Sequence, residues 1–95
     1  MEIFSDKRFE KFFNAVASLK SKDEVRKFFE DVCTIKEVED MAQRLEVAEL
    51  LTMGSNYQEV VKSTGASTAT ISRVNKCINY GAGGYKLVLN KDGDK

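Results

Sequence analysis

The chain has 95 residues, of which 42% are apolar and 32% charged, a balance that excludes disorder and predicts one domain over residues 1–95. Without histidine, and with Cys33 and Cys77 too far apart for a CxxC pair, the sequence excludes a zinc site and predicts reduced, packed thiols and no required metal or cofactor. No apolar run suits a secretion signal or a membrane span, so we expect a cytoplasmic protein that does not contact membranes. The complete absence of proline favours an all-α fold, a small helical bundle with short turns.

Two short amphipathic helices are predicted in the first third of the chain. Ser5 is placed to cap the first helix, and Ser21 with Glu24 forms a capping box for the second. Six phenylalanines fall within the first 29 residues, and they either fill a private core or pack against a second copy of the chain, which we favour. The apolar positions at helical spacing are Phe9, Phe12, Phe13, Val16 and Leu19, then Val25, Phe28, Phe29 and Val32.

A longer helix is predicted from Thr34, which forms a capping box with Glu37, to a stop at Gly54. We expect this helix to be the spine of the fold, and we assign residues 1–54 to core and dimerisation helices. Its expected inward positions are Val38, Met41, Ala42, Leu45, Ala48 and Leu51.

Residues 55–79 have the organisation of a helix-turn-helix. Asn56 with Glu59 starts a short helix, Gly65 supplies the positive φ of the turn, and Ser67 can cap the second helix. The apolar positions expected to lock the two helices together are Val60 and Val61 before the turn, and Ile71 and Val74 after it. Ile78 is a further expected inward position of the second helix.

The net charge of zero hides an asymmetry along the chain. Residues 1–54 hold 12 acids and 9 bases, whereas residues 55–95 hold 3 acids and 6 bases. Between Val60 and Lys91 there is no acid, so a surface built from this part can approach phosphate without repulsion. The alternative is that sparse charge marks a more buried half.

The second helix of the motif would present side chains that are small or basic and never acidic. Small residues let a helix enter a major groove about 12 Å wide, while hydroxyls and long cations reach bases or phosphates. A serine and threonine cluster around a glycine can also be a plain loop. The predicted DNA contacts are Gln58, Lys62, Ser67, Thr68, Ala69, Thr70, Ser72, Arg73 and Lys76.

Residues 80–95 are predicted to form a glycine-rich tail that no helix crosses, because each glycine costs a helix ~1 kcal/mol. Residues 86–89 can pack as a short strand or helix, and residues 90–95 are expected to fray. The run from Gly81 to Gly84 lacks the Lys-Ser/Thr of a phosphate-binding loop, so nothing here indicates an enzyme.

Three blocks of this sequence resemble the tryptophan-repressor family, and the whole chain is similar to its small bacterial YerC/YecD-type members. The resemblance implies an intertwined homodimer whose N-terminal helices share one core. It also implies a transcriptional regulator, a repressor, that reads a palindromic site in double-stranded DNA with two helices about 34–36 Å apart. The blocks are Ala48-Glu49-Leu50-Leu51 with Gly54, then Gln58, then Gly65-Ala66 followed by Ala69-Thr70-Ile71-Ser72-Arg73.

The resemblance further implies a site for a small-molecule co-repressor, which in the family is tryptophan. Arg44 and Arg73 match the two arginines that grip the ligand, and Thr34 matches a threonine that assists them. Val74 and Cys77 stand where the family has a glycine and a serine, so we expect a ligand other than tryptophan, or none.

Alternatives remain at several of these positions. Arg44 can form an ion pair with Asp40 on its own helix, and Arg73 can contact DNA directly. Glu59 stands where the family has a DNA-contacting arginine, so it repels phosphate unless it serves only to cap with Asn56. A helical protein–protein interaction module without specific DNA binding is the alternative function, and weak salt dependence of binding would distinguish it.

Overall fold

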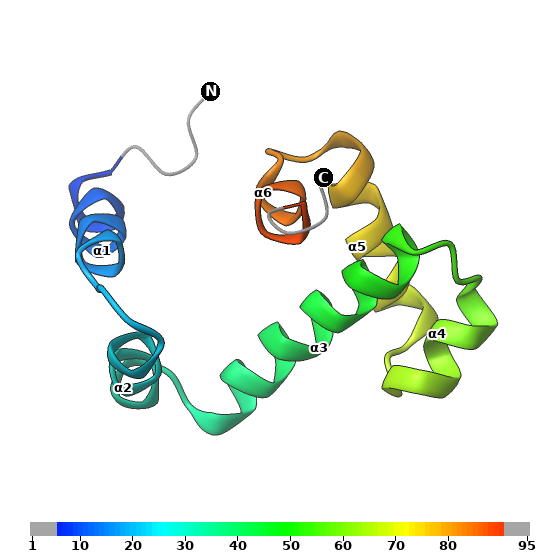
Figure 1. Ribbon diagram of the computed structural model, residues 1–95, viewed down its shortest axis with the longest axis horizontal. Helices are drawn as coiled ribbons and strands as arrows, with labels where there is room; N and C mark the ends of the chain where they lie inside the picture. Colours follow the sequence, from blue (N-terminus) through cyan, green and yellow to red (C-terminus); the bar gives the residue numbers. More distant parts are fainter. Residues whose placement is uncertain (1–5, 91–95) are drawn as a thin grey trace. The chain divides into compact units, whose positions relative to one another are not determined.

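The computed structural model describes residues 6–90, and every regular element in that range is a helix (Figure 1). The chain divides into two compact units, residues 1–38 and 39–95, with the boundary inside the third helix. Among the described residues, no helix is long and apolar enough to cross a membrane. The helices are α1 (Lys7–Ala17), α2 (Lys22–Val32), α3 (Ile35–Thr52), α4 (Tyr57–Thr64), α5 (Thr68–Tyr80) and α6 (Gly84–Leu89).

The first two helices begin at short polar caps. Ser5 lies outside the described residues, and the cap of α1 is Asp6, whose carboxylate accepts the Arg8 backbone N–H at 2.7 Å. That hydrogen bond, with a further one from the Arg8 side chain, holds the pKa of Asp6 below its usual range. At α2, Ser21 caps as predicted, but Glu24 accepts the backbone N–H of Lys20 at 2.8 Å, one residue before the cap.

Aromatic rings connect the two helices of the first unit, but no residue of either helix is buried. Phe12 of α1 and Phe28 of α2 lie with ring centroids 6.0 Å apart, and each also contacts the phenylalanine that follows it. Neither helix has a buried residue, however, and the side chain of Phe13 is 46% exposed. Within the first unit, the described phenylalanines therefore do not form a closed core.

The long helix α3 has the predicted start and stop. Thr34 accepts the backbone N–H of Glu37 at 3.1 Å, and Glu37 accepts that of Thr34 at 2.8 Å. At the other end Gly54 has φ +99°, and the N–H groups of Gly54 and Ser55 donate to the last free carbonyls of the helix. These bonds turn the chain sharply toward α4.

A small core in the second unit packs α4 and α5 against α3. Leu50, Leu51, Ile78, Tyr85 and Leu89 are partly buried around it. Its buried side chains are Val47 and Ala48 of α3, Val60 of α4, Ala66 of the turn, and Ile71 and Val74 of α5.

The core corrects two predicted packing faces. Val47, which was not predicted, is fully buried. Four of the positions predicted to face inward are exposed instead, namely Val38, Met41, Ala42 and Leu45. Because α3 carries apolar residues on more than one side, periodicity alone could not select the buried side. Val61 is also exposed and does not lock the two helices, because it lies one position past the inward side of α4.

The glycine-rich segment separates two helices, and of the strand or helix predicted over residues 86–89 the structure has a helix. Helix α5 continues through Tyr80, Gly81 follows it as the C-cap, and α6 starts at Gly84 after Gly83 with φ +92°. As predicted, no helix crosses this run, and the glycines stand at helix ends, where the interior penalty does not apply. The predicted fraying at 90–95 concerns residues that, apart from Asn90, lie outside the described range.

Both cysteines are free thiols, as predicted, but their placement differs from the prediction. Cys33 is the C-cap of α2 and is half-buried, while Cys77 lies on α5 and is exposed rather than packed. Cys77 therefore belongs to the surface of α5.

The adjacent valines of α4 provide a matched test of this core. Val60→Ala should lower the free energy of unfolding by about 1.5–3 kcal/mol, since it removes buried methyl groups and leaves a cavity. Val61→Ala removes the same atoms from an exposed position and should cost less than about 1 kcal/mol. Urea unfolding at one fixed protein concentration measures both, and equal losses would contradict the assigned core.

Candidate nucleic-acid interface

The turn between α4 and α5 is short and has its polar groups bonded. Gly65 has φ +75° and donates its N–H to the carbonyl of Val61 at 2.9 Å. The hydroxyl of Thr64 donates to the carbonyl of Val60 at 2.8 Å and accepts the N–H of Ala66 at 3.1 Å. With Ala66 buried in the core, these bonds fix the path of the chain between the two helices.

A side chain from α3 also supports this turn. Gln43 donates from Nε2 to the carbonyl of Thr64 at 3.2 Å, across 21 positions of sequence. Sequence reasoning missed Gln43, because a single glutamine on a helix carries no pattern that identifies its partner. Together with the core, it ties the end of α4 to the helix that supports it.

The N-terminus of α5 is capped as predicted, and this engages two of the predicted DNA-contacting residues. Ser67 accepts the backbone N–H of Thr70 and donates its hydroxyl to Thr70 Oγ1, both at 3.1 Å. Thr70 is half-buried, so its hydroxyl faces the cap more than solvent. The pair therefore orders the start of α5.

The remaining predicted contacts are exposed on α4 and α5. On α5 the exposed side lies opposite the buried Ile71 and Val74, so the same packing that forms the core presents it. Gln58 and Lys62 share one side of α4 at i,i+4 spacing. The exposed α5 positions form two neighbouring rows, Thr68, Ser72 and Lys76 in one and Ala69 and Arg73 in the other.

The acid that opens α4 is held in a capping box. Glu59 accepts the backbone N–H of Asn56 at 2.8 Å, and Asn56 Oδ1 accepts the N–H of Glu59 at 2.9 Å. Its carboxylate thus serves as the capping partner of Asn56, as the sequence indicated. From Val60 to the end of α6 the chain carries no other acid, so the exposed side of α5 has only cationic charge, from Arg73 and Lys76.

The five residues of the predicted ligand site occupy different environments. Thr34 belongs to the first unit and caps α3, while Arg44 is half-buried on α3 and Arg73 is exposed on α5. Val74 is 1% exposed and packs in the core. Cys77 lines an open pocket of about 400 Å³, together with Leu45, Gly81, Ala82, Gly84, Tyr85 and Val88.

The structure thus brings one predicted ligand residue of the second unit, Cys77, to a pocket, and does not bring Arg44, Arg73 or Val74 there. Within residues 6–90, no group of three or more histidine, cysteine or acidic side chains is arranged to hold a metal ion.

Comparisons with known proteins agree with this architecture. The sequence profile of the Trp repressor protein family matches residues 7–92. The protein YerC of Bacillus subtilis (strain 168) is 48% identical over 85 residues, which cover 90% of this chain and 82% of that protein.

Two solved structures have the same fold. A TrpR-like protein from Eubacterium eligens ATCC 27750 has a TM-score of 0.89 at 48% identity, over 95% of this chain and 93% of that one. A protein from Staphylococcus aureus has a TM-score of 0.88 at 34% identity, over 96% of this chain and 93% of that one.

Gly65 tests the conformation of the turn. Gly65→Ala should lower the free energy of unfolding by about 1–2 kcal/mol, because the residue has φ +75°, although no neighbour lies where the new methyl would be. Gly65→Asn should cost less, since asparagine tolerates this conformation better. Gly84→Ala, at a position without positive φ and with open space, is the control and should be nearly neutral in urea unfolding.

Proposed function

The chain belongs to the Trp repressor family, and from this membership we propose that it is a homodimeric transcriptional regulator that represses by binding double-stranded DNA through α4 and α5. The observation that carries the proposal is the exposed side of α5, which is small, hydroxylated or cationic and lies opposite a buried apolar side. A helix with these properties suits a major groove better than it suits a protein interior.

The side chains divide into two groups by their reach and chemistry. Thr68 and Ala69 are short, so they allow the start of α5 to approach base edges closely. Arg73 can form the paired hydrogen bonds that guanine O6 and N7 accept. We assign Lys62, Lys76 and Gln58 to phosphates, where they would position the protein without reading sequence.

Glu59 explains how an acid is tolerated near this surface. Its carboxylate accepts the backbone N–H of Asn56 and lies at the positive N-terminal end of α4. In the proposed complex it would therefore not extend toward the DNA groove. A carboxylate at this position cannot make the DNA contact that an arginine makes in the family. The preferred DNA sequence should therefore differ from the tryptophan operator.

We propose that a second copy of the chain covers the exposed apolar residues of the first three helices. Phe13 and Val32 are about half exposed, and Ile35, at the start of α3, is 80% exposed. The opposite side of α2 instead carries exposed ion pairs of Asp23 with Arg26 and Lys27. One apolar and one solvated side are what a helix at an interface between subunits requires.

The pocket beside Cys77 is the site we propose for an effector. Its volume of about 400 Å³ lies in the range of about 300–1,000 Å³ that is usual for small ligands. Val74 packs in the core close to Cys77 on α5, so a branched side chain occupies the position where the family has a glycine. We therefore propose an effector other than tryptophan.

Substitution of Arg73 tests direct reading of DNA. Arg73→Ala should weaken binding to a duplex of the preferred sequence by ~1–3 kcal/mol, whereas Asn79→Ala, exposed later on α5, should change it little. Arg73→Lys keeps the charge but loses the paired hydrogen bonds, so it should lose sequence preference while keeping non-specific affinity.

Fluorescence anisotropy over a range of salt concentrations measures these effects. The logarithm of the wild-type affinity should fall linearly with the logarithm of salt, with a slope that reports the phosphates contacted. Salt-independent binding, or full affinity of Arg73→Ala, would contradict the proposal and favour the protein-interaction alternative.

Substitution of Phe13 tests the dimer. Sedimentation equilibrium should give the wild type a mass of twice 10.7 kDa, and its midpoint of thermal unfolding should rise with protein concentration. Phe13→Glu places a charge in the proposed interface and should shift the equilibrium toward monomer or unfolded chain. Lys11→Glu, on the same helix and already charged, is the control and should remain a dimer. A wild-type mass of 10.7 kDa at every concentration would exclude the dimer.

A further inference from the structure

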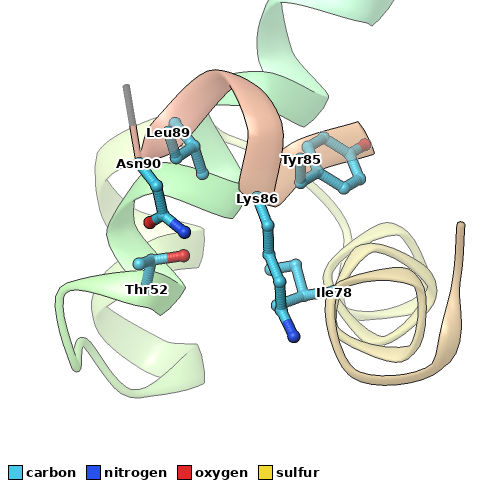
Figure 2. Close-up of a pocket in the computed structure, with 6 residues that line it drawn as sticks. All are labelled: Thr52, Ile78, Tyr85, Lys86, Leu89 and Asn90. Carbon is cyan, nitrogen blue, oxygen red and sulfur yellow. The ribbon is translucent and has the colours of Figure 1, made fainter. Parts of the chain in front are cut away.

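A smaller pocket of about 130 Å³ lies where α6 meets the end of α3 and the last turns of α5. Tyr85 is common to this pocket and to the one beside Cys77, and the other lining residues differ. None of the residues that line the smaller pocket belongs to the predicted ligand set or to the predicted DNA contacts. They are Thr52, Ile78, Tyr85, Lys86, Leu89 and Asn90 (Figure 2).

The pocket has an apolar floor and polar groups around it. Ile78, Tyr85 and Leu89 are half-buried and pack against the core of the second unit, so this floor is anchored. Thr52 supplies a hydroxyl, Asn90 an amide and Lys86 an ammonium group. Figure 2 shows Thr52 and Asn90 on one side of the pocket and Ile78 and Lys86 on the other.

Its charge favours an anion. Lys86 is the one charged residue among the six that line the pocket, and no acid occurs between Val60 and Asn90. A carboxylate placed here would gain charge-assisted hydrogen bonds from the lysine and neutral ones from the hydroxyl and the amide. A single cation matches one carboxylate group, not two.

The volume limits the ligand. A protein cavity of about 150 Å³ holds benzene, which has six carbon atoms, so a pocket of this volume accommodates a molecule of about that size. We propose that this pocket binds a short-chain aliphatic monocarboxylate, with its hydrocarbon on Ile78 and Leu89 and its carboxylate on Lys86, Thr52 and Asn90.

Binding would act on α6 first. This helix has six residues, follows Gly83 with φ +92°, and has no side-chain cap at its start. A ligand that contacts Thr52 of α3, Ile78 of α5 and Lys86 of α6 at once would tie these helices together. Hydrogen exchange of the α6 amides should therefore slow when the ligand binds. This inference does not depend on DNA binding.

The test uses ¹H–¹⁵N spectra of the full chain titrated with three probes. Isovalerate has both the hydrocarbon and the carboxylate, acetate lacks most of the hydrocarbon, and 3-methylbutan-1-ol lacks the charge. We expect saturable shifts at Thr52, Ile78 and residues 85–90 with isovalerate, and about tenfold or weaker affinity for the other two probes. The amides of α6 should exchange more slowly with isovalerate alone.

Two variants keep the test specific. Lys86→Met retains an exposed aliphatic stem and should lose about tenfold or more in isovalerate affinity, and Thr52→Val should show a smaller loss. Lys11→Met removes an equal charge from the exposed surface of α1 and should bind isovalerate as the wild type does. No saturable shift, shifts confined to the surroundings of Leu45 and Cys77, or unchanged affinity of Lys86→Met would each overturn the proposal.

Discussion

Close packing of two short helices on α3 is the constraint on which the second unit depends. The core is small, with four branched side chains and two alanines, Ala48 of α3 and Ala66 of the turn. Since Ile71 and Val74 hold one side of α5 in this core, its other side has no burial requirement. Short hydroxyls and cations can occupy that side without loss of stability, and this side is the one that we propose contacts DNA.

The described part of the first unit has no buried core like that of the second unit. Its two helices contact one another through phenylalanine rings, but neither buries a residue within the chain. In the proposed dimer, one interface would both complete the apolar packing and set the distance between the two copies of α5. Stability and DNA geometry would then be coupled, because a dimer that does not form also fails to present two helices at the spacing of a palindrome.

Local chemistry was largely predictable from the sequence. The caps at Ser21, Thr34, Asn56 and Ser67 depend on hydrogen bonds between residues two to four positions apart, so their signals are complete within a short segment. The positive φ of Gly65 was predicted for the same reason. The proposed DNA contacts were chosen from the helix-turn-helix pattern, and the family resemblance then supplied the tryptophan-repressor fold.

Contacts between distant segments were not predictable in this way. The buried side of α3 could not be selected, because Val47 and the exposed Met41 and Leu45 are equally apolar in sequence. The bond from Gln43 to Thr64 and the pocket around Lys86 arise only when separate helices meet. The choice between a strand and a helix over residues 86–89 was left open, because a short apolar run fits both until its neighbours are known.

Sequence-specific DNA binding by a dimer can be measured by selecting bound sequences from a random pool of duplex DNA. The selection uses purified protein at fixed salt, with and without L-tryptophan. The proposed dimer predicts an enriched palindrome whose half-sites are centred about 10–10.5 base pairs, or a multiple, apart, with the same enrichment in both conditions. An isolated half-site without its inverted copy would contradict the paired arrangement of α5. No enrichment in either condition would contradict sequence-specific DNA binding itself.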